Sequence, residues 1–282
     1  LFVASGCAAV YHGAPSRKPG TLEVTAIDVG QGDSLLVISP EGRAMLVDAG
    51  GSIGPVRSEF DYGEDVVSPY LWSRGLEHLD VVVLTHAHGD HIGGLARVIQ
   101  NFRPRELWVG INPETPALDK LYRVAAANHV AIRRHTAGEE FSWAGTHLRV
   151  LSPPANWRPK AQPTNDDSLA MLLGYGNTSA LLAGDVEKKM ERFISAESPR
   201  ADLLKVAHHG SNTSTTPELL DAVHPRFAVI SDGYRNPFHH PRTEVLKRLQ
   251  SAHVRTYRTD MLGAITFLLD GKQVQVKLNR PM

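Results

Sequence analysis

This chain is constrained most by one stretch, the apolar run Val81–Leu84 and the residues directly after it, Thr85-His86-Ala87-His88-Gly89-Asp90-His91. Four consecutive branched apolar residues are typical of a short strand that is buried on both faces. Two glycines follow, and then a helical pattern over Leu95–Phe102. The histidines therefore lie on a strand-to-helix loop whose glycines allow a tight backbone turn.

Three imidazoles and one carboxylate are gathered within six residues of this loop. Imidazole nitrogen and carboxylate oxygen suit first-row divalent ions such as Zn, Mn or Fe. The alternation of His86 and His88 directs both side chains to one side, which leaves Asp90 and His91 free to bind a second ion. The alternative is an exposed His-rich loop without metal, and the close packing of four candidate ligands after a buried strand argues against it.

The HxHxDH pattern after a buried strand resembles the signature of the metallo-β-lactamase superfamily of binuclear hydrolases. This resemblance implies an α/β protein with an αββα four-layer sandwich, in which two sheets pack face to face with helices outside. It also implies two divalent ions and hydrolytic chemistry.

The composition allows such a fold and limits the partners. The chain has 282 residues, of which 42% are apolar, enough for one large α/β domain or two small ones. Its 30 basic and 30 acidic side chains exclude a strong overall attraction to a polyanion, so nucleic-acid contacts must come from local patches. Cys7 stands alone, so no disulfide partner is expected within the chain.

The first twenty residues differ from the rest. Leu1–Val10 is apolar, but a membrane span needs about 20 residues. It is typical of the end of a transmembrane segment, a trimmed signal sequence or a frayed terminus. The basic stretch Gly13–Gly20 is typical of a linker. We therefore expect a tail over 1–20 and one hydrolase domain over 21–282.

Periodicity and turn residues predict the order of the elements. In the first half, strands are expected at Leu22–Asp28, Leu35–Ile38, Ala44–Val47, Val81–Leu84, Glu106–Val109 and Phe141–Leu151, and helices at Val66–Trp72, Leu95–Phe102 and Leu118–Asn128. In the second half, strands are expected at Leu169–Leu173, Ser179–Ala183, Leu203–Ala207, Phe227–Ile230, Ala264–Leu269 and Val274–Leu278, and helices at Glu187–Ser195, Pro217–Val223 and Thr243–Ala252. Residues 152–164 carry four prolines and are expected to form a surface loop.

Asp185 is the best candidate for the carboxylate that bridges two ions. It follows the apolar run Ala180–Ala183 and Gly184, so it lies where a buried strand ends. In the superfamily an Asp after such a strand bridges the metals. The alternative is a helix N-cap, which would not by itself need the preceding glycine.

His208 and His209 also follow a buried strand. Adjacent side chains diverge, so one is expected to bind metal and the other to contact a metal ligand or the substrate, and the sequence leaves the choice open. Ser211 and Ser214 lie just before the next predicted helix, where hydroxyls and backbone N–H groups suit an anion.

The segment Asn236–Pro241 is a third strand-to-loop site. His240 is a candidate proton donor to a leaving alkoxide or a phosphate contact, with Asn236 and His239 as further substrate contacts. The alternative is an ordinary exposed loop.

Three carboxylates end or follow early strands, namely Asp28, Asp33 and Asp48. Each is a candidate for orienting a metal-bound histidine through its second ring nitrogen. Turn formation in Asp-Gly sequences explains them equally well.

One departure from the superfamily pattern affects the choice of metal. The pattern supplies a further histidine between HxHxDH and the bridging Asp, but the candidates His129, His135 and His147 do not follow buried strands, and His147 is kept as the fallback. Asn165-Asp166-Asp167-Ser168 stands near the expected place, with Asn165 and Asp166 as supporting residues. Oxygen ligands there would favour Mn²⁺ over Zn²⁺, so we expect two divalent ions, with Mn²⁺ preferred and Zn²⁺ as the alternative.

Seven segments together resemble the metallo-β-lactamase-like domain of the ComEC competence family, from about Leu22 to the C-terminus. They are DVGQGDS, LVDAGG, THAHGDHIGG, NDDSL, LLAGDVE, LKVAHHGSNTS and NPFHHP. This resemblance implies a nuclease that degrades the DNA strand not taken up during transformation. It also implies a membrane-channel part in the same full-length protein and a domain on the extracytoplasmic side of the bacterial cytoplasmic membrane.

Local basic clusters are compatible with single-stranded DNA as the partner. They lie at Arg103–Arg105, Arg133–His135, Arg158–Lys160 and Arg235–Arg242, and Trp157, Tyr234 and Phe238 are interleaved with them. Only those in the 152–164 loop and near His240 are expected to flank the site. Two other functions stay open, a small-molecule hydrolase (phosphodiesterase or lactonase type) and a DNA-binding scaffold with little catalysis.

Overall fold

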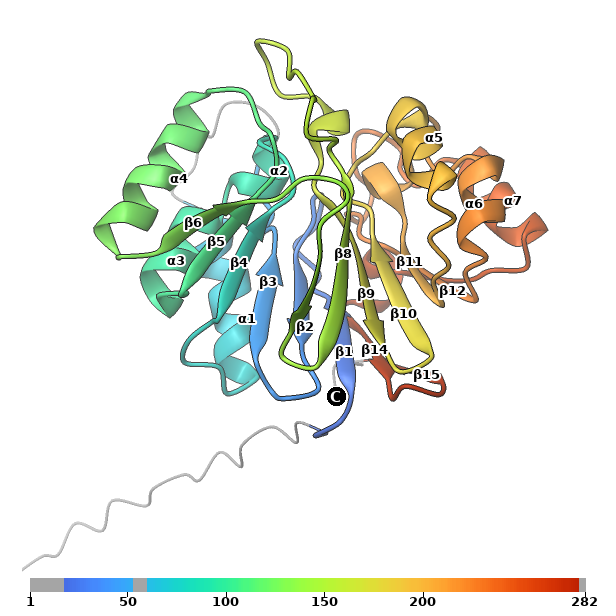
Figure 1. Ribbon diagram of the computed structural model, residues 1–282, viewed down its shortest axis with the longest axis horizontal. Coiled ribbons are helices and arrows are strands. Elements are labelled where there is room, and N and C mark those ends of the chain that lie inside the picture. Colours follow the sequence, from blue (N-terminus) through green and yellow to red (C-terminus); the bar gives the residue numbers. More distant parts are fainter. Residues whose placement is uncertain (1–17, 53–59, 279–282) are drawn as a thin grey trace, which may run out of the picture.

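The computed structural model of the chain describes residues 18–52 and 60–278. The strands of this part form two sheets packed face to face, with helices on both outer sides (Figure 1). The predicted αββα sandwich is confirmed. The expectations for Cys7, for Leu1–Val10 and for most of the linker lie outside the described residues. No helix in the described ranges combines the length and apolar character needed to cross a membrane.

The first sheet is built mainly from the first half of the chain. Its strand order is β15 (Val274–Leu278), β14 (Ile265–Leu269), β1 (Leu22–Ala26), β2 (Leu35–Ile38), β3 (Ala44–Val47), β4 (Val81–Leu84), β5 (Glu106–Val109) and β6 (Ala131–Arg134). The closing hairpin of the chain thus returns to pair beside β1. The outer helices are α1 (Ser68–Ser73), α3 (Leu95–Phe102) and α4 (Pro116–Ala127).

The second sheet is continuous in sequence. Its order is β13 (Arg255–Arg258), β12 (Phe227–Ile230), β11 (Leu203–Lys205), β10 (Thr178–Leu182), β9 (Ala170–Tyr175), β8 (Thr146–Ser152) and β7 (Glu140–Trp143). Its outer face is covered by α5 (Lys188–Ala196), α6 (Pro217–Val223) and α7 (Thr243–Ser251). Two short helices, α2 (Gly89–Ile92) and α8 (Thr259–Leu262), lie in loops.

Strand β4 shows why an unbroken apolar run is needed at this position. Val81 and Val83 pack between the two sheets, whereas Val82 and Leu84 pack against the outer helices. Side chains alternate across a strand, so both faces of a central strand in a four-layer sandwich must be apolar.

The functional loops are brought together by strand direction. Strands β3, β4 and β5 run parallel, as do β10, β11 and β12. The carboxyl ends of parallel strands meet at one edge of a sheet, and ligands bind there in open α/β sheets. The loop after β4, which contains α2, lies at the upper end of the sandwich in Figure 1.

Most predicted elements are present, with shifted ends. The expected strand Phe141–Leu151 is instead two strands, β7 and β8, separated by a turn in which Ala144 and Gly145 both have positive φ. The helix expected from Leu118 begins at Pro116, because the Thr115 hydroxyl accepts a hydrogen bond from the Leu118 N–H and caps it. Strand β13 and the short helices α2 and α8 were not predicted.

Candidate metal centre

The histidine loop after β4 places its side chains at the edge between the two sheets. His86, Asp90 and His91 are buried, and His88 is partly exposed. Nε2 of His86 lies 2.9 Å from Nδ1 of His88. The loop is packed so closely that a Cβ on Gly51 would stand 1.9 Å from the carbonyl oxygen of Gly89. A side chain at Gly51 would therefore displace α2 and its ligands.

Asp185 reaches the histidine loop from the second sheet. Its Oδ2 lies 3.2 Å from Nε2 of His91 and 3.3 Å from Nε2 of His209. The N-cap position of α5 is occupied by Glu187, not by Asp185, so the helix-cap alternative does not account for this residue. The carboxylate lies where one oxygen faces imidazoles from both halves of the chain.

His208 and His209 diverge because both have positive φ, near 51°. Nε2 of His209 lies 3.3 Å from Oδ2 of Asp90, whereas its Nδ1 lies 2.8 Å from the Ser231 carbonyl oxygen. The His208 ring turns away, with Nδ1 3.1 Å from Oγ1 of Thr213. Of the two predicted ligands, the structure thus brings His209 into the cluster and leaves His208 outside it.

One of the three early carboxylates orients a histidine, since Oδ2 of Asp48 lies 2.7 Å from Nδ1 of His91. Asp33 lies near His209, with its Oδ1 3.4 Å from Nδ1, but that nitrogen has its hydrogen-bond partner in the Ser231 carbonyl oxygen at 2.8 Å. The prediction for Asp28 is wrong, because its exposed side chain accepts the N–H of Gly30 and only shapes a turn.

The histidine missing from the superfamily pattern is not replaced by another imidazole among the described residues. His135 pairs with Glu139 at 2.8 Å, exposed His147 lies 3.7 Å from Glu140, and His129 is at the turn after α4.

Nor do the oxygens of residues 165–167 replace it. Asp166 accepts the Glu187 N–H at 2.9 Å, and the side-chain nitrogen of Asn165 lies 3.2 Å from Nδ1 of His208. The residue of this segment that reaches the cluster is Ser168, whose Oγ lies 3.3 Å from Nδ1 of His86 and accepts the Asp185 N–H at 3.0 Å.

Several predicted substrate contacts are engaged inside the fold. The Asn236 amide bonds the backbone of Gly233 and His240, and the buried Ser214 hydroxyl donates to the Val186 carbonyl. We therefore correct both to loop-forming roles.

The backbone N–H groups expected to bind an anion before α6 are already bonded to a side chain of the protein. The Glu191 carboxylate accepts the backbone N–H groups of Thr215 and Thr216. Oγ of Ser211 lies 3.0 Å from the Thr213 hydroxyl. His239 is exposed, and the His240 ring lies beside His208 at a centroid distance of 5.7 Å.

The charges in the cluster favour cations. Burial would raise the pKa of Asp90, but His91 and His209 outweigh it and lower that pKa well below the usual range. Burial opposes the charged form of His91 too, yet Asp185 and Asp48 raise its pKa well above the usual value. In contrast, burial and the neighbouring histidines His208 and His209 lower the pKa of His240 to about 4, so its ring is neutral at pH 7.

The donor set fits divalent metal ions. The donor atoms of His86, His91 and Asp185 lie within 4.8 Å of one another, as do those of Asp90, His91 and His209. Nε2 of His209 is buried and has no well-formed hydrogen bond within the described part of the chain, although two carboxylates are close. A buried nitrogen in this state is expected for an atom that binds a metal.

Lys205 is a component of the centre that the sequence did not reveal. It is fully buried at the end of β11 and forms ion pairs with Asp33 and Asp185. Burial alone would lower the pKa of its ammonium, but the two carboxylates outweigh it and raise that pKa. The sequence around Lys205, a lysine after two leucines, does not indicate a role in the site, because its partners come from distant segments.

A cleft of about 570 Å³ opens beside His88. Its basic and aromatic lining comes from Trp157, Arg158, Lys160 and Lys189, and Nζ of Lys189 lies 4.9 Å from the centre of the Trp157 ring. Nε2 of His88 lies 3.0 Å from the Pro163 carbonyl oxygen, so the 152–164 loop borders the metal cluster directly.

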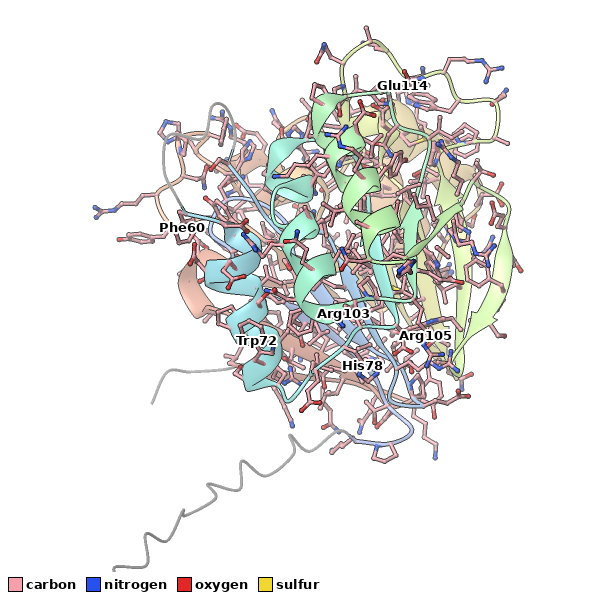
Figure 2. The ribbon with its side chains drawn as sticks, turned by 90° about the vertical axis from the view of Figure 1, so that its left-hand side faces the viewer. Phe60, Trp72, His78, Arg103, Arg105 and Glu114 are labelled. Atoms are coloured by element: carbon pink, nitrogen blue, oxygen red, sulfur yellow. The ribbon has the colours of Figure 1, made fainter. Side chains whose placement is uncertain are left out.

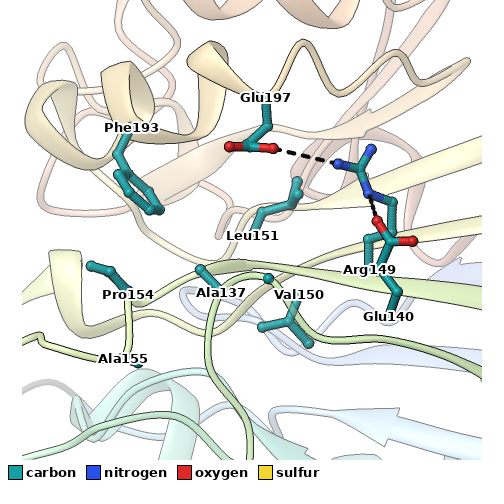
Figure 3. Close-up of a pocket in the computed structure, with 10 residues that line it drawn as sticks. Ala137, Glu140, Arg149, Val150, Leu151, Pro154, Ala155, Phe193 and Glu197 are labelled. Atoms are coloured by element: carbon teal, nitrogen blue, oxygen red, sulfur yellow. Dashed lines mark ion pairs between the residues drawn. The ribbon is translucent and has the colours of Figure 1, made fainter.

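Other surface features lie away from the cluster. A pocket of about 330 Å³ between β8 and α5, lined by Arg149, Phe193 and Glu197 among others, includes none of the predicted site residues (Figure 3). Arg103 and Arg105 precede β5 and lie toward the end of the sheet opposite the metal loops (Figure 2).

The comparisons with known proteins agree with this geometry. A family model described as the metallo-beta-lactamase superfamily matches residues 27–231. ComE operon protein 3 of Bacillus subtilis is 37% identical over 87% of this chain and 33% of its own length. Recombination protein 2 of Haemophilus influenzae is 32% identical over 92% of this chain and 30% of its own length. The chain thus spans about a third of these relatives.

Solved structures support the fold. The metallo-beta-lactamase fold protein YhfI from Bacillus subtilis has a TM-score of 0.55 at 14% identity, covering 91% of this chain and all of that one. CmlA, a diiron beta-hydroxylase from Streptomyces venezuelae, has a TM-score of 0.56 at 14% identity, covering 90% of this chain and 55% of that one. With the histidine loop, Asp185 and His209 gathered at the edge of an αββα sandwich, the chain belongs to the metallo-β-lactamase superfamily.

Proposed function

We propose that this chain is a metal-dependent nuclease that hydrolyses phosphodiester bonds of DNA, with single strands as the preferred substrate. The observation that carries this proposal is the cleft beside His88, whose lining includes Trp157 with Arg158, Lys160 and Lys189, next to the acidic Asp166 and Glu187. Basic groups that contact phosphates, together with an aromatic ring on which bases stack, are typical of single-strand binding sites.

The residues divide into two ligand groups that share one carboxylate. His86, His88 and Asp185 would hold one ion, and Asp90, His91, His209 and Asp185 would hold the other. When bound there, two ions would supply an activated water and stabilisation of the charge that develops on a phosphodiester. Asp48 and Ser168 keep His91 and His86 in orientation through their second ring nitrogens.

His240 has a narrower role than the sequence suggested. Its ring is neutral at pH 7, since its pKa is lowered to about 4, so it is a weak proton donor. It lies beside His208, and a neutral imidazole N–H there would donate a hydrogen bond to a phosphate oxygen.

The choice of metal follows from the missing histidine. The first ligand group proposed here has two imidazoles and one carboxylate, because His129, His135 and His147 all lie elsewhere in the described part of the chain. A site poorer in nitrogen favours Mn²⁺ over Zn²⁺. We therefore propose Mn²⁺ as the working ion.

The relatives support a place in DNA uptake. Those matched over most of this chain include a ComE operon protein, a recombination protein and a protein named as competence protein ComA. We propose that the domain degrades the strand that is not taken up, beside a membrane channel in the same full-length protein and on the extracytoplasmic side of the membrane.

The test is cleavage of labelled single- and double-stranded DNA with Mn²⁺, Zn²⁺, Mg²⁺ or chelator. Asp90→Asn and Asp185→Asn are compared with Asp28→Asn, a matched change at an exposed carboxylate. We expect Mn²⁺-dependent cleavage that both site variants lose and the control keeps.

Two other outcomes would redirect the assignment. Hydrolysis of a generic phosphodiester without cleavage of DNA would leave a small-molecule phosphodiesterase or lactonase-type hydrolase. Tight binding of single-stranded DNA with no cleavage of either substrate would favour a binding scaffold of an uptake channel.

A further inference from the structure

Lys205 is the last residue of β11 and its side chain points between the two sheets. Leu203, two residues earlier on the same face, belongs to the apolar core between the sheets, whereas Leu204 faces the outer helices. Lys205 is 0% exposed. An ammonium in such a position is costly unless each of its donors has a partner.

Each donor of this ammonium has an acceptor. Nζ lies 3.0 Å from the Gly184 carbonyl oxygen and 3.3 Å from Oδ1 of Asp185, and it also bonds Oδ2 of Asp33. A lysine ammonium has three N–H groups, so its hydrogen bonding is complete. The three acceptors come from two loops that belong to different sheets, so Lys205 also ties these loops together.

As a result, the two carboxylate oxygens of Asp185 have different partners. Oδ1 accepts from Lys205 and from the backbone N–H of His208, at 3.3 and 3.1 Å. Oδ2 is left to face Nε2 of His91 and Nε2 of His209, at 3.2 and 3.3 Å. The carboxylate plane is therefore fixed from the side opposite the imidazoles.

Asp33 is constrained in the same way. Together with Asp185 and His209 it has donor atoms close enough to hold a cation of its own. The Lys205 ammonium pairs with both carboxylates of that group.

We propose that Lys205 is a positioning residue of the metal centre, which presents only Oδ2 of Asp185 to both ions and withholds Asp33 from the ligand set. This inference rests on the two-ion centre proposed above. It adds a fixed cation to that centre, paired with both carboxylates.

The direction in which metal affinity changes when Lys205 is replaced distinguishes a positioning role from a purely electrostatic one. A fixed positive charge close to the ions repels them, so removing it should tighten metal binding if charge were its whole effect. Loss of orientation in the bridging carboxylate should weaken binding, and changes in groups that orient metal ligands typically cost about 10–100-fold in affinity. Positioning therefore predicts a change opposite to electrostatics.

The experiment titrates wild type, Lys205→Met and Leu203→Met with Mn²⁺ by calorimetry, and counts bound ions by elemental analysis. Leu203→Met is a volume-conserving change on the same strand and face. We expect two ions in wild type and in Leu203→Met, and one in Lys205→Met, with at least tenfold weaker binding of the other. Two ions bound to Lys205→Met with equal or greater affinity would overturn the proposal.

Asp33→Asn keeps the inference testable if Lys205→Met does not fold. This variant removes one carboxylate partner of Lys205 but leaves Asp185 and Gly184, so we expect two ions with affinities within about threefold of wild type. Fewer than two ions in Asp33→Asn would make Asp33 a ligand and overturn the proposal. Fewer than two ions in wild type would instead remove the two-ion centre itself, and the role of Lys205 with it.

Discussion

Oδ2 of Asp48 lies 2.7 Å from Nδ1 of His91, and the same carboxylate accepts the hydroxyl and the backbone N–H of Thr85 at 2.6 and 2.9 Å. All three residues are buried. The pair fixes the His91 ring so that Nε2 points at Asp185 and the cluster. A ligand held in this way loses little freedom when a metal binds.

Asp48→Asn should therefore weaken the centre without dissolving the fold. An amide accepts hydrogen bonds only through its oxygen, so it cannot keep the ring, the Thr85 hydroxyl and the Thr85 N–H bonded together, and its NH₂ group faces one of these donors. We expect Mn²⁺ affinity to fall about 10–100-fold, measured by calorimetric titration. Asp28→Asn serves as the control, because that carboxylate only shapes an exposed turn. An unchanged affinity in Asp48→Asn would contradict the orienting role.

The variants His208→Ala and His209→Ala should differ in the number of metal ions that they bind. His209→Ala removes a ring whose Nε2 faces Asp90 and Asp185, and we expect one bound ion to be lost. His208→Ala removes a ring that contacts Asn165 and Thr213, and we expect both ions to remain. Elemental analysis after dialysis decides, and the reverse pattern would show that the rings exchange places when metal binds.

The basic cleft should contribute to the binding of DNA and not to the hydrolysis step itself. In Arg158→Ala/Lys160→Ala, two positive charges beside His88 are lost. The slope of log kcat/KM against log salt for single-stranded DNA should become less negative by about 1.4, which corresponds to two phosphate contacts. Hydrolysis of a small phosphodiester should be unchanged.

The matched control for the cleft is Arg103→Asn/Arg105→Gln, a basic pair toward the opposite end of the sheet. Asn is chosen at position 103 because Arg103 has a φ of 42°, a conformation that Asn tolerates. An equal loss of salt dependence in this variant would mean that DNA is bound by overall charge and not by the cleft.

Asp232 should make stability depend on pH. Both carboxylate oxygens are buried without a hydrogen bond among the described residues, and burial, followed by Asp260, raises the pKa to about 7. The folded state thus holds a proton that the unfolded state releases near pH 4. Its stabilising effect is complete below that pH and is lost as the pH rises to about 7.

Asp232→Asn should remove this dependence. At pH 8 the variant should be more stable than wild type by about 2–4 kcal/mol, a thermal shift of several degrees, whereas at pH 4 the two should match. Thermal unfolding in chelator at a series of pH values measures the difference, and Asp221→Asn at an exposed site is the control. A constant difference across pH would show that Asp232 is ionised throughout.

The sequence predicts those parts of the site that are local. His86, His88, Asp90 and His91 follow a strand whose burial is visible in its composition, and the loop geometry needs only nearby glycines. Asp185 is found by the same logic, since it follows β10. The fold follows from the same signals, because strands buried on both faces require layers on both sides.

The remaining parts depend on contacts between distant segments. The choice of His209 over His208 follows from positive φ at both residues, which no periodicity reveals. Lys205 is explained by Gly184, Asp33 and Asp185, and Asp28 differs from Asp48 in burial and in what lies opposite it. The division between β7 and β8 depends on a turn whose first residue is an alanine, a residue that rarely adopts positive φ.

The His91–Asp185 contact joins residues 94 positions apart, and each sheet supplies one of them. During synthesis the full ligand set cannot assemble until β11 and the loop after it have left the ribosome, because His209 lies in that loop. Long-range contacts of this kind form late. A fully bound metal centre therefore requires that both sheets have formed. A chain with only one sheet formed would have the histidine loop without the ligands that the other sheet supplies.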